Sequence, residues 1–116
     1  MKKLLTALLT GCALAAGAQA AGYPDKPVTM IVPFAPGGST DMVARLMTTK
    51  MGEKLGQPFI VENKPGATGA IGATQVKRAA PDGYTLLVAS IGIYATNPFL
   101  QKNLSYDPMK DFDLMT

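Results

Sequence analysis

Apolar and β-branched residues gather in three short runs along the chain, at 28–34, 59–62 and 84–90. Runs of this length, bounded by turn residues, are typical of buried strands. Between them, apolar positions recur every three or four residues, which predicts helices over 42–55 and 68–80. Strands and helices that alternate in this way predict an α/β fold built on a parallel βαβαβ sheet with right-handed crossovers.

The first predicted helix has the clearest helical pattern. Its apolar residues recur at three- and four-residue steps, at Val43, Leu46, Met47, Met51 and Leu55. Gly56 is expected to end this helix as a C-terminal cap. After the third strand, the pattern predicts a turn and a short helix over 91–104, a turn region over 105–112 and the start of another strand over 113–116.

Residues 1–20 differ from the rest of the chain. A lysine pair precedes an apolar run over 4–17, and Ala18-Gln19-Ala20 has the form of a cleavage site. This pattern predicts a secretory signal peptide and a mature chain that starts at Ala21. The apolar run is shorter than the about 20 residues that span a bilayer. Lipid attachment at Cys12 stays open as an alternative, and both forms predict a periplasmic protein.

Composition narrows the classes of function. The formal charge of +3 includes the lysine pair, and the rest of the chain holds nine basic against eight acidic residues, a net charge of +1. This is too weak for a nucleic-acid partner. The chain has no His and its single Cys is Cys12, which removes Ser-His-Asp and Cys-His pairs and the usual zinc ligands from the mature segment. We expect no catalytic residue, no metal and no cofactor.

Three turns are the candidate binding segments. In a parallel sheet, the turns that follow the strands lie along one edge, and ligands bind there. The segments 35–41, 65–69 and 90–97 occupy these positions, and each is rich in small or hydroxyl residues. We therefore expect any ligand to lie on this edge.

The first turn carries the strongest signal. Gly37 and Gly38 let the backbone approach a ligand closely, and Ser39 or Thr40 can cap the following helix. The free N–H groups of a helix start attract an anion. Asp41 is expected in the first helical turn, where its carboxylate can accept N–H groups of the loop. A capped turn without a ligand stays open as the alternative.

The second turn also opens a helix with a nearly bare backbone, with glycines at 66, 69 and 72. Glycine costs roughly 1 kcal/mol relative to alanine inside a helix, so these three glycines need a reason. Close approach of a ligand and tight packing are the two candidates, and packing is expected to explain Gly72. No lysine follows as in a phosphate-binding P-loop, and the spacing is not that of dinucleotide sites. Two bare helix starts on one edge predict a pincer for a carboxylate.

The third turn offers polar groups with weaker signals. Ser90, Tyr94, Thr96 and Asn97 can reach the same edge. Tyr94 can equally be a core ring, and Asn97 followed by Pro98 can be a purely structural helix start.

Several pieces of the sequence also carry a family resemblance. They are YPDKPVTMIVPFAPGGSTD at 23–41, VENKPGATGAIGA at 61–73, APDGYTLLVAS at 80–90, NPFL at 97–100 and YDPMKDF at 106–112. In this order they resemble the substrate-binding proteins of tripartite tricarboxylate transporters, also called the Bug family. The resemblance covers nearly the whole mature chain.

The resemblance implies a two-lobed periplasmic binding fold, similar to type II, in which residues 21–116 form part of the first lobe. It also implies a monomeric receptor that captures a small organic carboxylate and delivers it to membrane subunits of the transporter. In the family, two loops pinch one carboxylate. The positions that match these loops are Phe34, Ala35, Gly37, Gly38, Ser39, Thr40 and Asp41 in the first, and Gly66, Ala67, Thr68 and Gly69 in the second.

Two departures and two alternatives accompany the resemblance. Ile91, Ile93 and Tyr94 stand where the family usually carries small hydroxyl residues, which implies a more apolar wall. Family members are much longer, so the chain is expected to lack the hinge and the second lobe. A carboxylate sensor that presents its ligand to a membrane kinase stays open. An exported α/β hydrolase is disfavoured because no nucleophile–base pair is present.

Overall fold

The computed structural model describes residues 22–115. The predicted signal peptide, the alternative lipid site Cys12 and Thr116 lie outside these residues. Within the described range, none of the helices combines the length and the apolar character needed to cross a membrane.

Three parallel strands form the sheet: β1 (Val28–Val32), β2 (Phe59–Asn63) and β3 (Thr85–Leu87). The strand order is β2-β1-β3, so β1 is central and pairs on both sides. The predicted α/β fold with a parallel sheet is therefore confirmed. β1 stops before Pro33, which has no N–H group to donate to a neighbouring strand.

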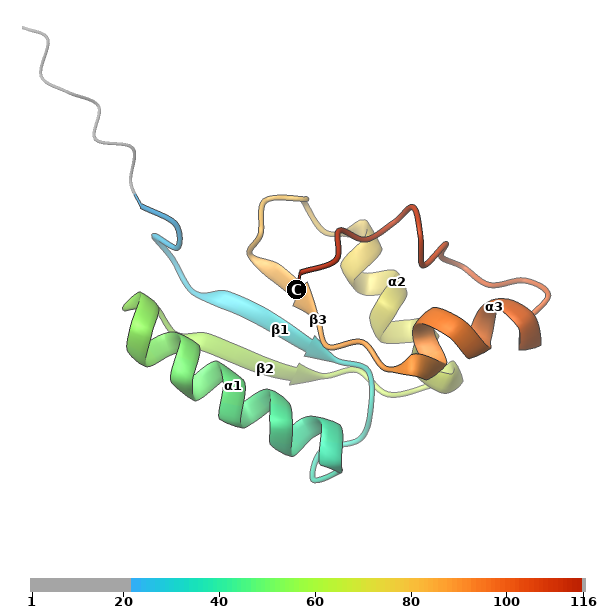
Figure 1. Ribbon diagram of the computed structural model, residues 1–116, viewed down its shortest axis with the longest axis horizontal. Coiled ribbons are helices and arrows are strands. Elements are labelled where there is room, and N and C mark those ends of the chain that lie inside the picture. Colours follow the sequence, from blue (N-terminus) through green and yellow to red (C-terminus); the bar gives the residue numbers. More distant parts are fainter. Residues whose placement is uncertain (1–21, 116) are drawn as a thin grey trace, which may run out of the picture.

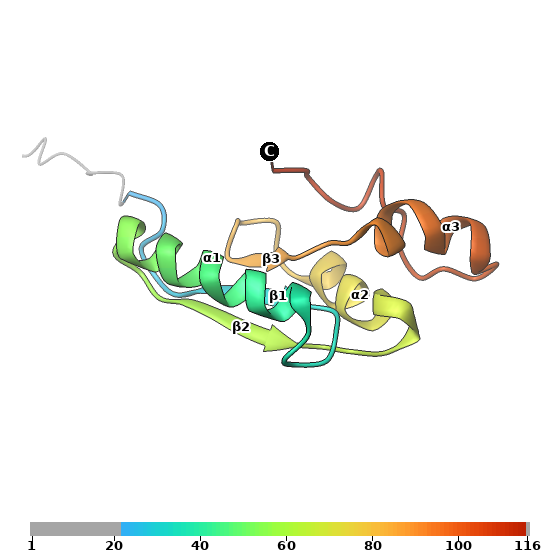
Figure 2. The same cartoon turned by 60° about the horizontal axis from the view of Figure 1, so that its bottom comes forward.

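Two helices connect these strands (Figures 1 and 2). The helix α1 (Ser39–Leu55) joins β1 to β2 and lies along both, whereas α2 (Ala70–Arg78) joins β2 to β3 and contacts β3 and β1. After β3, a π-helical turn (Gly92–Thr96) runs into the short helix α3 (Asn97–Leu100), which lies near the start of α2. Because the two crossovers leave in opposite directions and both are right-handed, their helices cover opposite faces of the sheet.

Each face of the sheet has its own apolar core. Leu86 packs with the α1-side cluster and Leu87 with the α2-side cluster, because successive side chains of a strand point to opposite faces. The buried residues of the α1 side are Met30, Val32 and Ala44. Those of the α2 side are Ala70, Ala73, Ile93 and Tyr106.

The boundaries of several elements differ from those predicted. The strands expected over 28–34 and 84–90 end early, at Val32 and Leu87, and α1 begins at Ser39 instead of 42. The helix expected over 68–80 begins only at Ala70, because a turn of opposite hand precedes it. The strand expected from 113 is absent over the described residues 113–115.

The sheet-facing side of α1 coincides with its apolar stripe only at Met51, which packs against the core. Asp41, Ala44 and Thr48 are buried against the sheet, and their small size lets the helix approach closely. The largest apolar side chains of its first half are exposed. The exposed group consists of Met42, Val43, Leu46 and Met47. The periodicity therefore identified the helix but not its buried face.

Candidate functional site

Two loops leave the same edge of the sheet. Loop 1 (33–38) follows β1 and loop 2 (64–69) follows β2 (Figure 1). Val32 and Asn63, the last residues of these strands, are partners in the parallel register. The N–H of Lys64 donates to the Val32 carbonyl at 2.8 Å, which extends the pairing into loop 2. The expectation that these two turns share the carboxyl edge is therefore confirmed.

Buried Pro33 brings the two loops into contact. A Cβ atom added at Gly72 would lie 2.8 Å from the Cβ of Pro33, and one added at Gly69 would lie 3.5 Å from it. Real Cβ atoms do not approach as closely as the first of these distances. Tight packing thus explains Gly72, as predicted, and the start of loop 1 packs against the start of α2.

Loop 1 ends in an uncapped helix start. Gly38 is the N-cap of α1, and the first intrahelical bond runs from the Met42 N–H to the Gly38 carbonyl at 3.0 Å. The N–H groups of Ser39, Thr40 and Asp41 precede this bond, and no side chain caps them. The prediction that Ser39 or Thr40 caps the helix is wrong, because both lie inside α1 and the cap position belongs to a glycine without a side chain.

The carboxylate of Asp41 fixes the shape of loop 1 from inside. Its Oδ2 accepts the Gly37 N–H at 2.9 Å and Arg45 Nε at 3.0 Å, and its Oδ1 accepts Asn63 Nδ2 at 2.9 Å. The same Asn63 amide donates to the carbonyl of Phe34 at 3.1 Å, and Arg45 donates to Asn63 Oδ1 at 3.1 Å. The network ties loop 1 to the end of β2.

These contacts favour the ionised form of Asp41. Arg45 is the largest cause, followed by the Gly37 N–H and Asn63, and together they lower the pKa of the Asp41 carboxyl well below its ordinary value of 3.8. The residue is only 3 % exposed. With both oxygens engaged, this carboxylate holds the loop, and the expected N–H acceptance from the loop is observed.

Loop 2 closes with a left-handed turn. Gly66, Ala67, Thr68 and Gly69 all have positive φ, at 125°, 46°, 54° and 88°. The N–H of Gly69 donates to the Gly66 carbonyl at 2.9 Å, and the N–H of Ala70 donates to the Ala67 carbonyl. The expected second bare helix start is therefore corrected: the turn occupies the N–H groups of the N-cap Gly69 and of Ala70, the first residue of α2. The N–H groups of Ala67 and Thr68 precede these bonds, and both residues are exposed.

Residues at the end of the third turn and at the end of α3 hold loop 2 by hydrogen bonds to its carbonyl groups. Asn97 is 1 % exposed, and its Nδ2 donates to the Thr68 carbonyl at 3.0 Å. Gln101 Nε2 lies 3.4 Å from the Ala67 carbonyl. Ser90 accepts the N–H groups of Ile93 and Tyr94 through its own carbonyl and so begins the π-helical turn. Asn97 is thus engaged inside the fold, which favours its structural alternative.

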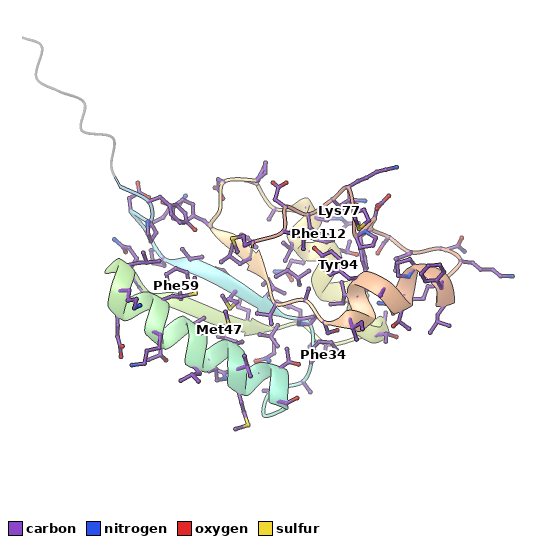
Figure 3. All side chains as sticks on the ribbon, viewed as in Figure 1. Phe34, Met47, Phe59, Lys77, Tyr94 and Phe112 are labelled. Carbon is purple, nitrogen blue, oxygen red and sulfur yellow. The ribbon has the colours of Figure 1, made fainter. Side chains whose placement is uncertain are left out.

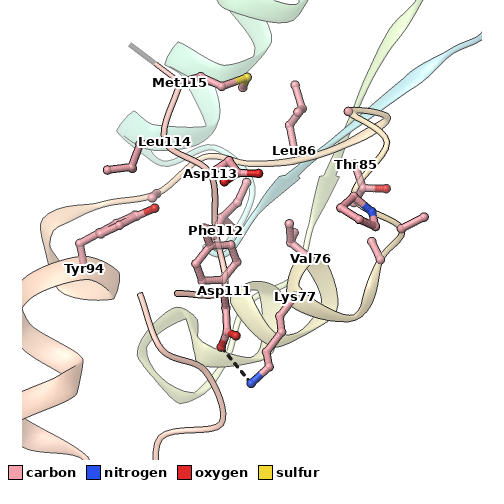
Figure 4. Close-up of a pocket in the computed structure, with 16 residues that line it drawn as sticks. Val76, Lys77, Thr85, Leu86, Tyr94, Asp111, Phe112, Asp113, Leu114 and Met115 are labelled. Atoms are coloured by element: carbon pink, nitrogen blue, oxygen red, sulfur yellow. Dashed lines mark ion pairs between the residues drawn. The ribbon is translucent and has the colours of Figure 1, made fainter. Parts of the chain in front are cut away.

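Tyr94 lies in the apolar cluster on the α2 side. Its ring centroid is 6.4 Å from that of Phe112, and burial raises the pKa of its hydroxyl. Figures 3 and 4 show both rings on the same side of the sheet as α2. This placement favours the core-ring alternative over a ligand contact.

A pocket of about 410 Å³ lies at another margin of the sheet, between β3, the end of α2 and residues 111–115 (Figure 4). Its lining mixes apolar and polar groups, and Lys77 and Asp111 in its wall already form an ion pair at 2.9 Å. Neither loop 1 nor loop 2 contributes to its wall. The loops are the better site, because they combine exposure with N–H groups that precede the local hydrogen-bonded turns.

Sequence reasoning missed the residues that hold the loops. Arg45 and Asn63 carry the loop 1 network, and Tyr106 supports Asn97. Only Asn63 had a usable signal, since a polar residue at the carboxyl end of a strand faces the expected edge. In residues 22–115, no group of His, Cys, Asp and Glu side chains could hold a metal ion.

Comparison with known proteins gives a consistent family. Residues 43–116 match the family model described as the tripartite tricarboxylate transporter family receptor. A protein from the TAR-I ttuE-ttuC' intergenic region of Agrobacterium vitis is 48 % identical over 111 residues, which cover 95 % of this chain and 32 % of that protein. The chain thus spans about a third of the length of this curated relative.

Solved structures agree. The periplasmic binding protein BugD is 52 % identical with a TM-score of 0.74, over 78 % of this chain and 30 % of its own. MatC from Rhodopseudomonas palustris, solved with bound malate, is 50 % identical with a TM-score of 0.74, over 78 % of this chain and 31 % of its own. The family model is described as a receptor and BugD as a periplasmic binding protein, and both descriptions agree with the prediction of a binding protein.

Proposed function

The chain belongs to the tripartite tricarboxylate transporter receptor family, and on this premise we propose that it binds a small organic carboxylate between loop 1 and loop 2. The observation that carries the proposal is the shared edge: two exposed loops follow paired strands, and each presents N–H groups ahead of its first local hydrogen bond. The bound malate of MatC supports the same chemical class of ligand.

Backbone N–H groups would hold the acid. The start of α1 adds the positive end of a helix dipole, and successive N–H groups of a turn form an anion-binding concavity. A hydrogen bond to a charged group contributes about 1.5–3 kcal/mol. Three or four such bonds can exceed an association cost of at least ~4 kcal/mol and leave micromolar affinity, about −8 kcal/mol.

The proposed contacts follow from this arrangement. Loop 1 and the start of α1 would contact the carboxylate through backbone groups, whereas Asp41 would act by shaping the loop, because its oxygens are occupied. Ser90 stays a proposed contact at the edge. The contributing positions are Phe34, Ala35, Gly37 and Gly38 of loop 1, with Ser39 and Thr40 at the start of α1. Those of loop 2 are Gly66, Ala67, Thr68 and Gly69.

The wider role is proposed on the same premise. Residues 21–116 would be part of the first lobe of a two-lobed, monomeric periplasmic receptor, exported by the signal peptide at 1–20. The match to BugD supports this location. Family membership favours delivery of the acid to transporter membrane subunits over presentation to a membrane kinase. Loss of radiolabelled acid uptake in a strain that lacks the gene, with restoration by the gene, distinguishes the two roles.

Calorimetry on the full natural chain tests the binding function. The panel contains malate, citrate, glutamate and benzoate, each with its neutral amide as a matched control. We expect micromolar affinity for at least one acid and at least about tenfold weaker binding of its amide, a difference of about 1.4 kcal/mol. Absence of binding by every acid, with both loops unaltered, would overturn the proposal.

A further inference from the structure

A buried amide lies directly beneath the left-handed turn of loop 2. Asn97, at the start of α3, is 1 % exposed and reaches back 29 residues to the Thr68 carbonyl at 3.0 Å. The same nitrogen lies 3.1 Å from the hydroxyl of Tyr106, which donates to the Ile93 carbonyl at 2.9 Å. The turn, α3 and the π-helical turn are thus joined through one side chain.

The turn needs such support, because its conformation is unfavourable for the residues that form it. Ala67 and Thr68 both have positive φ, a region that L-residues with a Cβ avoid and that is an outlier for β-branched side chains. Strained backbone persists only where its surroundings enforce it. The partners of this turn are the Asn97 amide below it and the more distant Gln101 amide.

The amide of Asn97 is held at a cost. Its side-chain oxygen is buried and has no hydrogen-bond partner among the described residues. Buried polar groups in proteins are almost always paired, so an unpaired one calls for an explanation. A side chain that served only to fill space here would be apolar. An asparagine at this position supplies a donor for Thr68.

We infer that Asn97 is a positioning residue that holds loop 2 in the shape required for carboxylate binding and does not touch the ligand itself. The inference deepens the proposed function and rests on it for the role of loop 2. It assigns Tyr106 the task of orienting the amide. Loss of the donor should release the turn without unfolding the sheet, since Asn97 lies outside the two strand-pairing interfaces.

Amide hydrogen exchange on the ligand-free protein tests the positioning directly. The N–H groups of Gly69 and Ala70 close the turn, so they report its integrity. In Asn97→Asp, which keeps the shape but replaces the NH2 donor with a carboxylate oxygen, we expect these two amides to exchange at least about tenfold faster, while the β1 and β2 amides keep their rates. Asn103→Asp, the same change at an exposed asparagine, should leave all of these rates unaltered.

Calorimetry then connects the turn to binding. The acid that binds the unaltered protein should bind Asn97→Asp about tenfold more weakly and Asn103→Asp equally well. Tyr106→Phe keeps the Thr68 bond and frees the amide to rotate, so it should show a smaller rise in both exchange rate and Kd. If Asn97→Asp does not fold, Tyr106→Phe decides the question through the same two amides.

Unchanged exchange at Gly69 and Ala70, or an equal rise at every amide of the sheet, would overturn the inference. Faster exchange at these two amides with unchanged Kd would also overturn it, since the turn would then not serve binding. If no acid binds the unaltered protein, the proposed function fails, whereas the exchange rates still decide whether Asn97 positions the turn.

Discussion

Loop 1 and loop 2 present N–H groups on one edge of the sheet but are built in opposite ways. Loop 1 uses glycine at its one left-handed position, Gly37, and is held by a charged carboxylate with an arginine and an asparagine. Loop 2 places two residues with a Cβ in the left-handed region and is held by neutral amides. The first loop is relaxed and held by charged groups, whereas the second is strained and held by hydrogen bonds from neutral amides.

The difference indicates how each loop should fail. A charged brace responds to pH and to loss of the charge, while its backbone tolerates substitution. A strained turn is insensitive to pH in the physiological range but responds to any change in its backbone preferences. Four substitutions separate these behaviours, and they are ordered here from the largest expected effect to the smallest.

Gly38→Val should abolish carboxylate binding, with a rise in Kd of at least about 100-fold, or about 2.7 kcal/mol. The branched side chain would occupy the space over the start of α1 where the acid is proposed to lie. The fold should survive, because Gly38 has φ −77° and an added Cβ meets only the Ala35 carbonyl at 3.7 Å. Calorimetry with Gly38→Ala as the control measures the effect, and unchanged affinity would remove loop 1 from the site.

Gly66→Ala should weaken binding by about tenfold and lower the free energy of unfolding by about 1–3 kcal/mol, since φ 125° with ψ 153° is a region essentially reserved for glycine. Denaturant unfolding and calorimetry measure the two effects. Gly22→Ala, where an added Cβ meets nothing within 4 Å, is the control. Equal stability in both variants would contradict the strain assigned to loop 2.

Asp41→Asn should make stability less dependent on pH in acid. The folded pKa of Asp41 lies below its unfolded value, so its contribution is fully present above about pH 4, the ordinary range of Asp, and is lost as the pH falls toward the lowered pKa. Denaturant unfolding between pH 3 and 6 should show a shallower slope for the variant than for the unaltered protein. An identical slope would show that loop 1 is not braced by this charge.

Thr68→Asn should have the smallest effect, a gain of about 1 kcal/mol in the free energy of unfolding, because asparagine tolerates the left-handed region better than a β-branched residue. Carboxylate affinity should stay unchanged if the backbone N–H of residue 68 is the donor. Urea unfolding and calorimetry measure both quantities. A clear loss of affinity would indicate that the threonine hydroxyl itself contacts the ligand.

The sequence was sufficient for the parts of the fold that depend on local patterns of apolar and turn residues. Apolar runs located all three strands, and glycine-rich turns located both loops on one edge. It failed at α1, where small residues and Asp41 face the sheet and most of the apolar stripe does not. Helical periodicity states that two faces differ, but the contacts of the neighbouring strands decide which face is buried.

The site was predictable at the level of backbone and poorly at the level of side chains. Gly37 and Gly38 were visible as turn residues, yet the left-handed turn at Ala67 and Thr68 was not, because neither residue favours that conformation. Of the side chains that hold the loops, Asn63 had a positional signal at the carboxyl end of its strand, whereas Tyr106 had none, because its contact with Asn97 forms only in the folded chain. Interactions of this kind are set by tertiary packing and leave no local pattern.

Buried Pro33, at the start of loop 1, packs closely against Gly69 and Gly72 at the end of loop 2 and the start of α2. A shift of one loop relative to the other would therefore cause a clash. The two loops therefore hold their relative position before a ligand binds. Little conformational entropy of the loops remains to be lost on binding. The ligand meets N–H groups that are already oriented, so the two loops need not become ordered first.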